Sequence, residues 1–282
     1  MAGLTASPPR TLVLLAHPDD ETLGASTLLA ALGPAARMVH VTDGAPRAMG
    51  DAEHAGCGTR EAYAALRGEE CAAALSLVGI APAQQTTLGV VDQETWRDLA
   101  GLTRQVKAVI ERERPAFLVT HPYEGGHPDH DATAFAAHAA CALVQVEGGE
   151  PPVLVEQTSY HADPDPDAPD RLATASFLVA PSAECSGADL SRMDLHGADA
   201  ITTVVLDDAE RARKAAMFAA YASQARVLTH FSIAVERFRR APAYDFTRPP
   251  AATIWYERLG WEITAADVCG AARDALRTLG LP

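Results

Sequence analysis

The chain has 282 residues, enough for one large domain or two small ones, and 48% of them are hydrophobic and 21% charged, as in globular proteins. Its net charge of −14 argues against nucleic acid or an anionic membrane surface as a partner, because both need a basic patch. Five scattered cysteines form no C-x-x-C motif, which favours free thiols in a reducing compartment over disulfides or a thiolate metal site. The N-terminal segment has two prolines and no apolar core, and no apolar stretch approaches the roughly 18 residues of a membrane span, so we expect a cytoplasmic protein.

The first half of the chain alternates short apolar runs with longer helical patterns. Buried strands are predicted at 11–16, 37–42, 117–120 and 152–160, and helices at 22–32, 59–78, 93–114 and 131–146. The order β-α-β-α-α-β-α-β predicts an α/β fold, in which a Rossmann-like parallel sheet is flanked by helices on both faces. Ligands of such sheets bind at the carboxyl ends of the strands.

The second half has a less regular pattern. Strand-like runs are predicted at 175–180 and 201–206, helices at 207–222, 224–239 and 265–279, and irregular proline-rich segments at 161–170 and 240–250. The sequence has no internal repeat and no true linker. We therefore expect a single domain over 1–282, with a core at about 10–160 and a smaller C-terminal elaboration at about 161–282.

Two histidine–carboxylate clusters each follow a predicted buried strand. Ala16-His17-Pro18-Asp19-Asp20-Glu21 comes directly after the apolar run 12–15, and His127-Pro128-Asp129-His130 lies just past the run 117–119. A single His-Pro-Asp is common in turns, and acidic residues in a first helical turn also favour the helix dipole. Two such clusters at two strand ends are hard to obtain by accident, so the sequence predicts a metal site.

Three residues of the clusters are candidate metal ligands. A catalytic zinc site usually has three protein ligands and an open position for water. His17 and Asp20 are three apart at a strand end, where a tight turn would direct both inward, and His130 would be the third ligand from another loop. This combination is typical of metal-assisted hydrolysis.

The remaining members of the clusters have candidate catalytic roles. Asp19, beside a ligand, is the candidate general base that takes a proton from water. His127 is the candidate donor to the oxyanion that forms on a carbonyl, and Asp129 would orient a histidine through a hydrogen bond.

These two clusters resemble the motifs of the PIG-L (LmbE-like) family of zinc-dependent N-deacetylases. The likeness covers roughly the first half of the chain and resumes near residue 214. It also includes Thr42-Asp43-Gly44, Arg67-x-x-Glu70, Lys214 and Tyr221-Ala222-Ser223-Gln224. The family acts on N-acetylglucosaminyl groups in glycolipid, mycothiol and bacillithiol precursors, and its fold is Rossmann-like without a dinucleotide. The resemblance implies Zn²⁺ bound by His17, Asp20 and His130, Asp19 as the base, and His127 at the oxyanion.

The chain departs from the family pattern at two places. Many relatives continue with glycines where this chain has Ala25-Ser26-Thr27. Some sugar deacetylases carry a mobile tyrosine near the position of Gly125, and Tyr123 is the candidate substitute here.

The candidate substrate contacts are Arg67, Asp92, His121 and Tyr123. Arg67 is either a substrate contact or half of a helix-surface pair with Glu70. Asp92 either closes a sugar pocket or is a turn residue, and His121 touches substrate, touches a carboxylate, or is a core histidine. The three tryptophans are expected to be packing residues, although an aromatic ring can also stack on a sugar.

The sequence thus predicts a cytoplasmic enzyme, a zinc-dependent N-deacetylase that removes an acetyl or short acyl group from an N-acetylglucosaminyl-type small molecule, with Fe²⁺ or another divalent ion as an alternative metal. The alternatives are an amidase of the same fold that cleaves a larger amide, and a non-catalytic metal or sugar-conjugate binding protein. A dinucleotide enzyme is disfavoured, because no G-x-G-x-x-G follows the first strand. The oligomeric state, including a homo-oligomer, is left open.

Overall fold

One eight-stranded sheet forms the centre of the molecule. The computed structural model describes residues 7–161, 183–190 and 200–282, and the strand order is β3-β2-β1-β4-β5-β8-β7-β6. The strands are β1 Thr11–Leu15, β2 Ala36–Pro46, β3 Gln85–Asp92, β4 Phe117–Thr120, β5 Val153–Gln157, β6 Ala183–Cys185, β7 Ile201–Val205 and β8 Val235–Arg240. Strands β1 to β5 pair in parallel, whereas β8 runs antiparallel to both of its neighbours, β5 and β7. The predicted α/β class with a mostly parallel sheet is confirmed.

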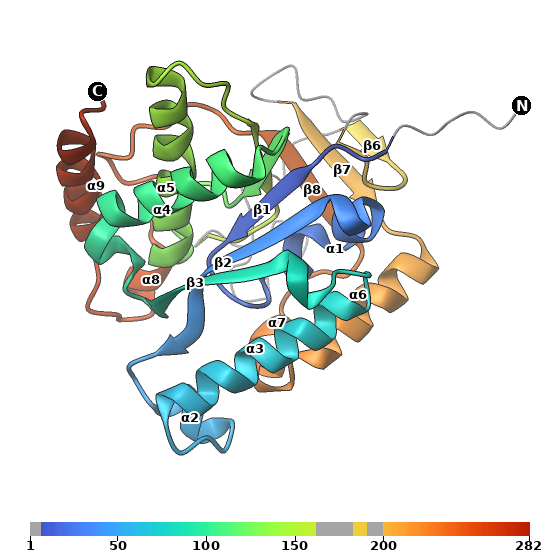
Figure 1. Ribbon diagram of the computed structural model, residues 1–282. Helices are drawn as coiled ribbons and strands as arrows, with labels where there is room; N and C mark the ends of the chain where they lie inside the picture. Colours follow the sequence, from blue (N-terminus) through green and yellow to red (C-terminus); the bar gives the residue numbers. More distant parts are fainter. Residues whose placement is uncertain (1–6, 162–182, 191–199) are drawn as a thin grey trace, which may run out of the picture.

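Helices cover both faces of this sheet, as Figure 1 shows. They are α1 Asp20–Leu32, α2 Gly50–His54, α3 Arg60–Ser76, α4 Leu99–Glu113, α5 Pro128–Val146, α6 Asp208–Ala220, α7 Ala225–Leu228, α8 Trp255–Arg258 and α9 Ala265–Leu279. Helix α6 contacts both α1 and α3, and α4, α5 and α9 form a second group. None of the helices in the described part of the chain is long and apolar enough to span a bilayer.

The apolar strand β1 is buried on both faces, which explains its unbroken hydrophobic run. Val13 and Leu15 pack in the core that includes Leu28 of α1, whereas Leu12 and Leu14 pack in the core that includes Val106 of α4. Successive side chains of a strand point to opposite faces, so a strand between two helical layers needs apolar residues at every position.

The predicted helix at 224–239 is wrong. Helix α7 ends at Leu228, and the chain then forms strand β8. In β8 the side chains of Glu236 and Phe238 are buried while the intervening Arg237 and Arg239 are partly exposed, which is the alternation of a strand. The sequence does not reveal this alternation, because a glutamate is not expected at a buried position. The burial of Glu236 depends on partners elsewhere in the fold.

The predicted helix at 93–114 begins too early. Strand β3 ends at Asp92, a short 3₁₀ turn spans Thr95–Asp98, and the Asp98 side chain then caps α4 by accepting from the Gly101 backbone N–H at 2.8 Å. Strand β3 is partly exposed and rich in polar residues, so it lacks the apolar run that marks the inner strands. The strand predicted at 175–180 lies outside the described residues.

Candidate metal centre and active-site cavity

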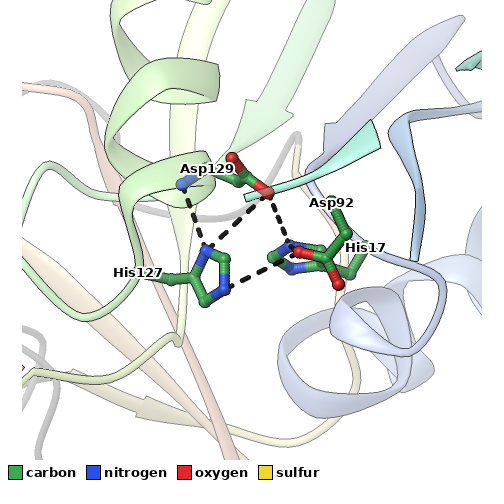
Figure 2. Close-up of side chains that lie close together, drawn as sticks. All are labelled: His17, Asp92, His127 and Asp129. Atoms are coloured by element: carbon green, nitrogen blue, oxygen red, sulfur yellow. Dashed lines mark hydrogen bonds and ion pairs between the residues drawn. The ribbon is translucent and has the colours of Figure 1, made fainter. Parts of the chain in front are cut away.

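The second histidine–carboxylate cluster forms the start of α5. His127 is the N-cap residue, and its Nδ1 accepts a hydrogen bond from the Asp129 backbone N–H at 3.1 Å (Figure 2). Pro128 occupies the first turn, where its missing N–H costs no helical hydrogen bond. His130 lies in the same turn and is buried, because this end of α5 points into the molecule beside the carboxyl end of β1.

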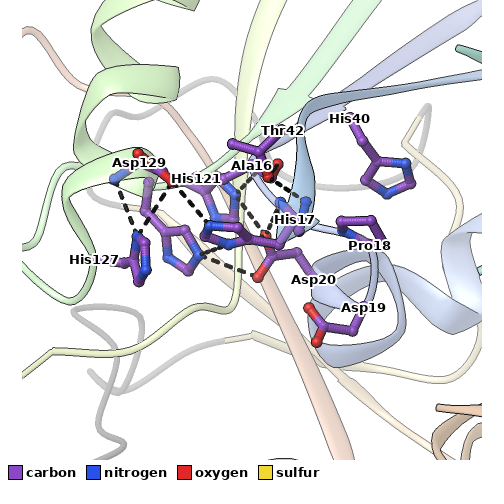
Figure 3. A network of polar contacts seen from close by, with 12 residues as sticks. Ala16, His17, Pro18, Asp19, Asp20, His40, Thr42, His121, His127 and Asp129 are labelled. Carbon is purple, nitrogen blue, oxygen red and sulfur yellow. Dashed lines mark hydrogen bonds and ion pairs between the residues drawn. The ribbon is translucent and has the colours of Figure 1, made fainter. Parts of the chain in front are cut away.

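The first cluster forms the tight turn between β1 and α1. The Asp20 carboxylate accepts a hydrogen bond from the His17 backbone N–H at 2.7 Å, and β2 holds the turn because the backbone N–H and hydroxyl of Thr42 both donate to the Ala16 carbonyl at 2.9 Å. Asp19 has a positive φ of 133°, which non-glycine residues seldom adopt. Figure 3 shows the result: the Asp20 carboxylate lies among the histidines and the Asp19 carboxylate lies apart from them.

The three predicted metal ligands come together in one group. His17 Nδ1 is 3.2 Å from His130 Nε2 and 3.3 Å from Asp20 Oδ2, and His130 Nε2 is 3.2 Å from Asp20 Oδ1. Ligands about 2.0 to 2.1 Å from a tetrahedral ion are about 3.3 Å apart, so this spacing fits a single small divalent cation. The donor set of two imidazoles and one carboxylate also suits zinc or iron.

Hydrogen bonds to the other ring nitrogens orient both histidines for this role. His17 Nε2 lies 3.2 Å from Asp129 Oδ2 and 3.1 Å from Asp92 Oδ1, as Figure 2 shows. His130 Nδ1 lies 3.1 Å from the Ser159 hydroxyl. Partners at these ring nitrogens can hold the protons on His17 Nε2 and His130 Nδ1, which would leave His17 Nδ1 and His130 Nε2 to ligate an ion beside the Asp20 carboxylate.

The local charges favour a cation at this place. Burial opposes a charge on His17, but the carboxylates of Asp92, Asp129 and Asp20 outweigh it and raise the pKa of His17. Burial lowers the pKa of His130 to about 3, so its imidazole is neutral and able to ligate. The same carboxylates that favour a proton on His17 would favour a metal ion beside it.

Asp129 is held in place by three donors that the sequence did not reveal. Its carboxylate accepts from the backbone N–H of Gln93 at 2.6 Å and from both the backbone and the hydroxyl of Thr95. Its contact with His17 is the one expected of a residue that orients a histidine. The partners lie in the turn after β3, which carries no motif, so only the fold brings them to the site.

Asp19 lies beside Arg67 at the edge of the centre. An Arg67 guanidinium nitrogen donates to Asp19 Oδ2 at 3.1 Å and to the Pro18 carbonyl at 2.5 Å. Burial raises the pKa of Asp19 to about 7, although the charge of Arg67 acts in the opposite direction. The alternative surface pair between Arg67 and Glu70 is not formed, because Arg67 is buried and Glu70 instead accepts from the backbone and hydroxyl of Ser223.

His127 is neutral and presents an N–H to the site. Because its Nδ1 accepts from the Asp129 backbone, the ring proton is on Nε2, which lies 3.9 Å from Asp92 Oδ1. Burial, followed by the neighbouring His17, lowers the pKa of His127 to about 3. His127 also belongs to a second group of residues that could hold a metal ion, with His17, Asp92 and Asp129, but its Nε2 would have to give up its proton to ligate one.

Two predicted substrate contacts do not reach the cavity. The ring of His121 stacks on His130 with 3.9 Å between centroids, and its Nε2 accepts from the Ala16 backbone N–H at 3.0 Å. His121 therefore helps to hold the ligand His130 and the turn after β1 in place. Tyr123 donates its hydroxyl to the Arg248 carbonyl at 2.8 Å and packs against Phe246. Neither residue is among those that line the cavity, and His121 Nε2 lies 3.3 Å from Asp20 Oδ2, which is the carboxylate contact that the sequence left open for it.

A cavity of about 570 Å³ opens over the centre. His17, Asp19, Asp20, Arg67, Asp92 and His127 all line it. Tyr160, Phe231, Trp255 and Trp261 line it as well. The rings of Trp261 and His127 pack edge-on, with 5.0 Å between their centroids. Two of the three tryptophans thus line the cavity, whereas Trp96 packs in the core beside Leu99.

Comparison with known proteins matches the first half of the chain to one family model and to one curated relative. Residues 12–141 match the model of the PIG-L family, described as GlcNAc-PI de-N-acetylase. A probable N-acetyl-alpha-D-glucosaminyl L-malate deacetylase 2 from Bacillus anthracis is 32% identical over 139 residues. That match covers 47% of this chain and 59% of the relative, so the chain spans less than two thirds of the length of this curated protein.

Solved structures with the same fold extend the likeness beyond the matched region. The zinc-inhibited form of teicoplanin deacetylase Orf2 is 16% identical, with a TM-score of 0.57 over 83% of this chain and 100% of the other. The A40926 pseudoaglycone deacetylase Dbv21 is 19% identical, with a TM-score of 0.55 over 84% and 99% of the two chains. At such identities the likeness is one of fold. Both histidine–carboxylate clusters lie within residues 12–141, the segment that matches the PIG-L family model.

Proposed function

We propose that this protein is a metal-dependent hydrolase that removes an acetyl or other short acyl group from the amine of an N-acetylglucosaminyl-type conjugate. One observation carries the proposal: three ligand atoms are spaced for a single ion, and two of these ligands, His17 and Asp20, line a cavity together with a carboxylate and a neutral histidine that the ion does not need. A protein that only bound a metal would require neither Asp19 nor the Nε2–H of His127.

The metal would be held by His17, Asp20 and His130. We propose Zn²⁺, with Fe²⁺ as the alternative, because the two imidazoles and one carboxylate suit either ion. When bound, the ion supplies Lewis acidity, which acidifies water and polarises an amide carbonyl. The carboxylates of Asp92 and Asp129 contact His17 Nε2 and hold the ring in the orientation that ligation requires.

The chain's own groups would handle the proton and the developing charge. Asp19 accepts the proton of the attacking water, and Arg67 keeps its carboxylate in one position through a hydrogen bond of 3.1 Å. His127 donates its Nε2–H to the oxyanion that replaces the amide carbonyl. The protonated Asp19 then delivers this proton to the leaving amine, because the neutral His127 has no acidic proton to give.

The polar residues that line the cavity suit a sugar. Arg67 and Asp92 both line it, and a guanidinium group and a carboxylate can exchange hydrogen bonds with sugar hydroxyl groups. The printed names of the relatives support a small amino-sugar conjugate as substrate. Five free cysteines support a cytoplasmic location, and the net charge of −14 supports a small molecule over nucleic acid or an anionic membrane as the partner.

A release assay tests this function. Purified protein loaded with Zn²⁺ or Fe²⁺ is incubated with a panel of N-acetylglucosamine conjugates, and free amine and free acetate are both quantified. We expect equal amounts of amine and acetate from at least one conjugate, and an Asp19→Asn variant that keeps its metal should lose about 10² to 10⁴ of the rate. Release of an acid larger than acetate from larger amides would favour the amidase alternative, and metal binding without any release would favour the binding protein.

A further inference from the structure

Residues of two chemical kinds line the cavity. The polar ones include the catalytic residues together with Arg67, Ser223 and Gln224. The apolar ones include Val227, Phe231, Trp255, Leu259 and Trp261, and we use the name apolar wall for these five residues below. The apolar wall begins at the catalytic end, because Trp261 packs edge-on against His127.

The outer part of the apolar wall is unusually exposed. Val227 is 52% exposed and Leu259 is 47% exposed. Large hydrophobic side chains with such exposure are few in the described part of the chain, where the others are Leu77, Val146, Val205 and Ile233. Exposed apolar groups at the rim of a cavity are typical of a binding site for an apolar ligand group.

We propose that the substrate carries an apolar group, aromatic or branched aliphatic, next to its acylated amino sugar, and that this group packs against the apolar wall. This inference rests on the proposed function and specifies its substrate class. A sugar alone would leave much of the wall in contact with water, because its hydroxyl groups need polar partners and Val227 and Leu259 offer none. The cavity volume of about 570 Å³ is also in the range of about 300 to 1,000 Å³ that holds drug-sized ligands.

The competing chemistry is an anionic substituent. Arg226 and His54 line the same cavity and would attract a carboxylate, but Asp51 is present beside them on the cavity lining and opposes it. The net charge of −14 opposes an anion further. The test therefore needs a neutral apolar, a small neutral and an anionic conjugate of the same sugar.

Binding can be measured without turnover. The probes are the phenyl, methyl and carboxymethyl glycosides of glucosamine, which resemble the amine products, and tryptophan fluorescence of the metal-loaded full chain reports Kd because Trp255 and Trp261 line the cavity. We expect the phenyl glycoside to bind about ten-fold more tightly than the methyl glycoside, as partial burial of one aromatic ring predicts. We expect the carboxymethyl glycoside to bind no better than the methyl one.

Matched variants locate the preference. In a Val227→Ser, Leu259→Ser double variant the phenyl-to-methyl ratio of affinities should fall to about three-fold or less. The control is Val205→Ser with Leu77→Ser, which changes side chains that are 40% and 47% exposed but that do not line the cavity, and which should keep the ratio of the parent protein.

The outcomes separate this inference from the proposed function. Equal affinities for the phenyl and methyl glycosides, a preference for the carboxymethyl glycoside, or a phenyl preference that survives in the Val227→Ser, Leu259→Ser variant would each overturn the inference. Sedimentation of the protein with neutral phosphatidylcholine vesicles, without a phenyl preference, would assign the exposed rim to a lipid surface and overturn it as well. Failure of the proposed function would appear differently, as a lack of acetate release from every N-acetylated glycoside while the binding preference remains measurable.

Discussion

At the scale of single residues, the site depends on which nitrogen of each histidine carries the proton. Asp129 and Asp92 fix the ring of His17, Ser159 fixes that of His130, and the backbone N–H of Asp129 fixes that of His127. Two of the rings therefore turn a lone pair toward the Asp20 carboxylate, and the third turns an N–H into the cavity. The same residue type thus serves as ligand or as donor according to its partner.

Removal of His130 should remove the metal. Without this ligand only His17 and Asp20 remain, so we expect His130→Ala to lower the affinity for Zn²⁺ by more than about 100-fold, since even partners of ligands contribute 10- to 100-fold. Elemental analysis after dialysis gives the metal content. His54→Ala, which changes an exposed histidine on the same cavity, is the control, and full metal occupancy in His130→Ala would remove this residue from the ligand set.

Removal of His127 should instead spare the metal and reduce turnover. The lost Nε2–H would stabilise charge that exists only in the transition state, so kcat should fall by about 10² to 10³ while KM changes by a few-fold at most. His127→Asn, whose amide can also donate, should recover part of kcat. Steady-state kinetics with parallel metal analysis provides the readout, and loss of Zn²⁺ from His127→Ala would show that the residue is a ligand.

At the scale of elements, the turn between β1 and α1 depends on one buried carboxylate. Glu21 accepts hydrogen bonds from the Asp19 backbone N–H at 3.0 Å, the Thr22 hydroxyl at 2.8 Å, the imidazole of His40 at 3.1 Å and the Tyr221 hydroxyl. Four donors use all the acceptor capacity of a carboxylate. They hold Asp19 at its positive φ, a conformation that costs on the order of 1 to 3 kcal/mol.

Glu21→Gln should therefore disturb Asp19 without touching the ligands. The amide NH₂ would face two donors, which we expect to cost about 1 to 3 kcal/mol of stability and to lower kcat by about 10- to 100-fold with little change in KM or metal content. Thr22→Ala, which removes one donor and leaves the carboxylate, is the matched control and should keep kcat within about two-fold. Normal kcat in Glu21→Gln would mean that the turn holds Asp19 by other contacts.

Helix α5 carries a histidine that should make stability depend on pH. The Nε2 of His138 is buried without a hydrogen-bond partner among the described residues, and the ring packs against both Tyr244 and Phe246. Burial lowers the pKa of His138 to about 4, below its ordinary value of 6.5. Below pH 6.5 the unfolded chain therefore binds a proton that the folded protein does not, so stability is lost as the pH falls toward 4.

The measurement compares His138→Leu with the parent protein by urea unfolding at several pH values. The free energy of unfolding of the parent should fall relative to that of the variant by about 2.5 kcal/mol between pH 7.5 and pH 4.5. His54→Gln, at an exposed histidine, should show no such pH-dependent difference. Parallel pH profiles for His138→Leu and the parent would contradict a buried neutral imidazole.

The sequence predicts well those helices and strands whose burial pattern follows from their own residues. The apolar strand Phe117–Thr120 and the amphipathic helix Ala265–Leu279 have the predicted bounds. Strand β8 could not be recognised, because Glu236 is buried through its contact with Lys214, which only the fold reveals. In the site, the residues of the two motifs were identified from sequence, but Ser159 and Thr95 were not, since each acts through a partner far away in the chain.

At the scale of the whole molecule, we propose that the C-terminal elaboration and the core unfold as one unit. Lys214 of α6 and Glu236 of β8 are fully buried and 3.1 Å apart, and Lys214 also donates to the Leu23 carbonyl of α1 at 2.8 Å. Ser26 of α1 donates to the same glutamate at 2.5 Å. One buried ion pair thus connects α1, near the metal centre, to strand β8, which comes last in the chain.

Breaking this pair should destabilise the entire protein. Lys214→Met leaves the Glu236 carboxylate buried without its counter-charge, which typically costs about 3 to 5 kcal/mol. The control is Lys107→Met, which removes surface ion pairs with Glu111 and Glu147 and should leave the unfolding midpoint close to that of the parent protein. Chemical denaturation followed by fluorescence and by far-UV circular dichroism should give one shared transition, and a variant that shifts only one of two separate transitions would show that the two parts are independent.

The late position of β8 in the chain also sets an order of events during synthesis. Strand β5 pairs with a strand from much later in the sequence: the paired residues Glu156 and Arg239 are 83 positions apart. The growing polypeptide on the ribosome therefore exposes an unpaired edge at β5 until β8 emerges, and such edges invite aggregation. His17, Asp20 and His130 all precede β5, whereas Val227 through Trp261 follow much later. A nascent chain thus holds its complete ligand set before the wall that would select its substrate has been made.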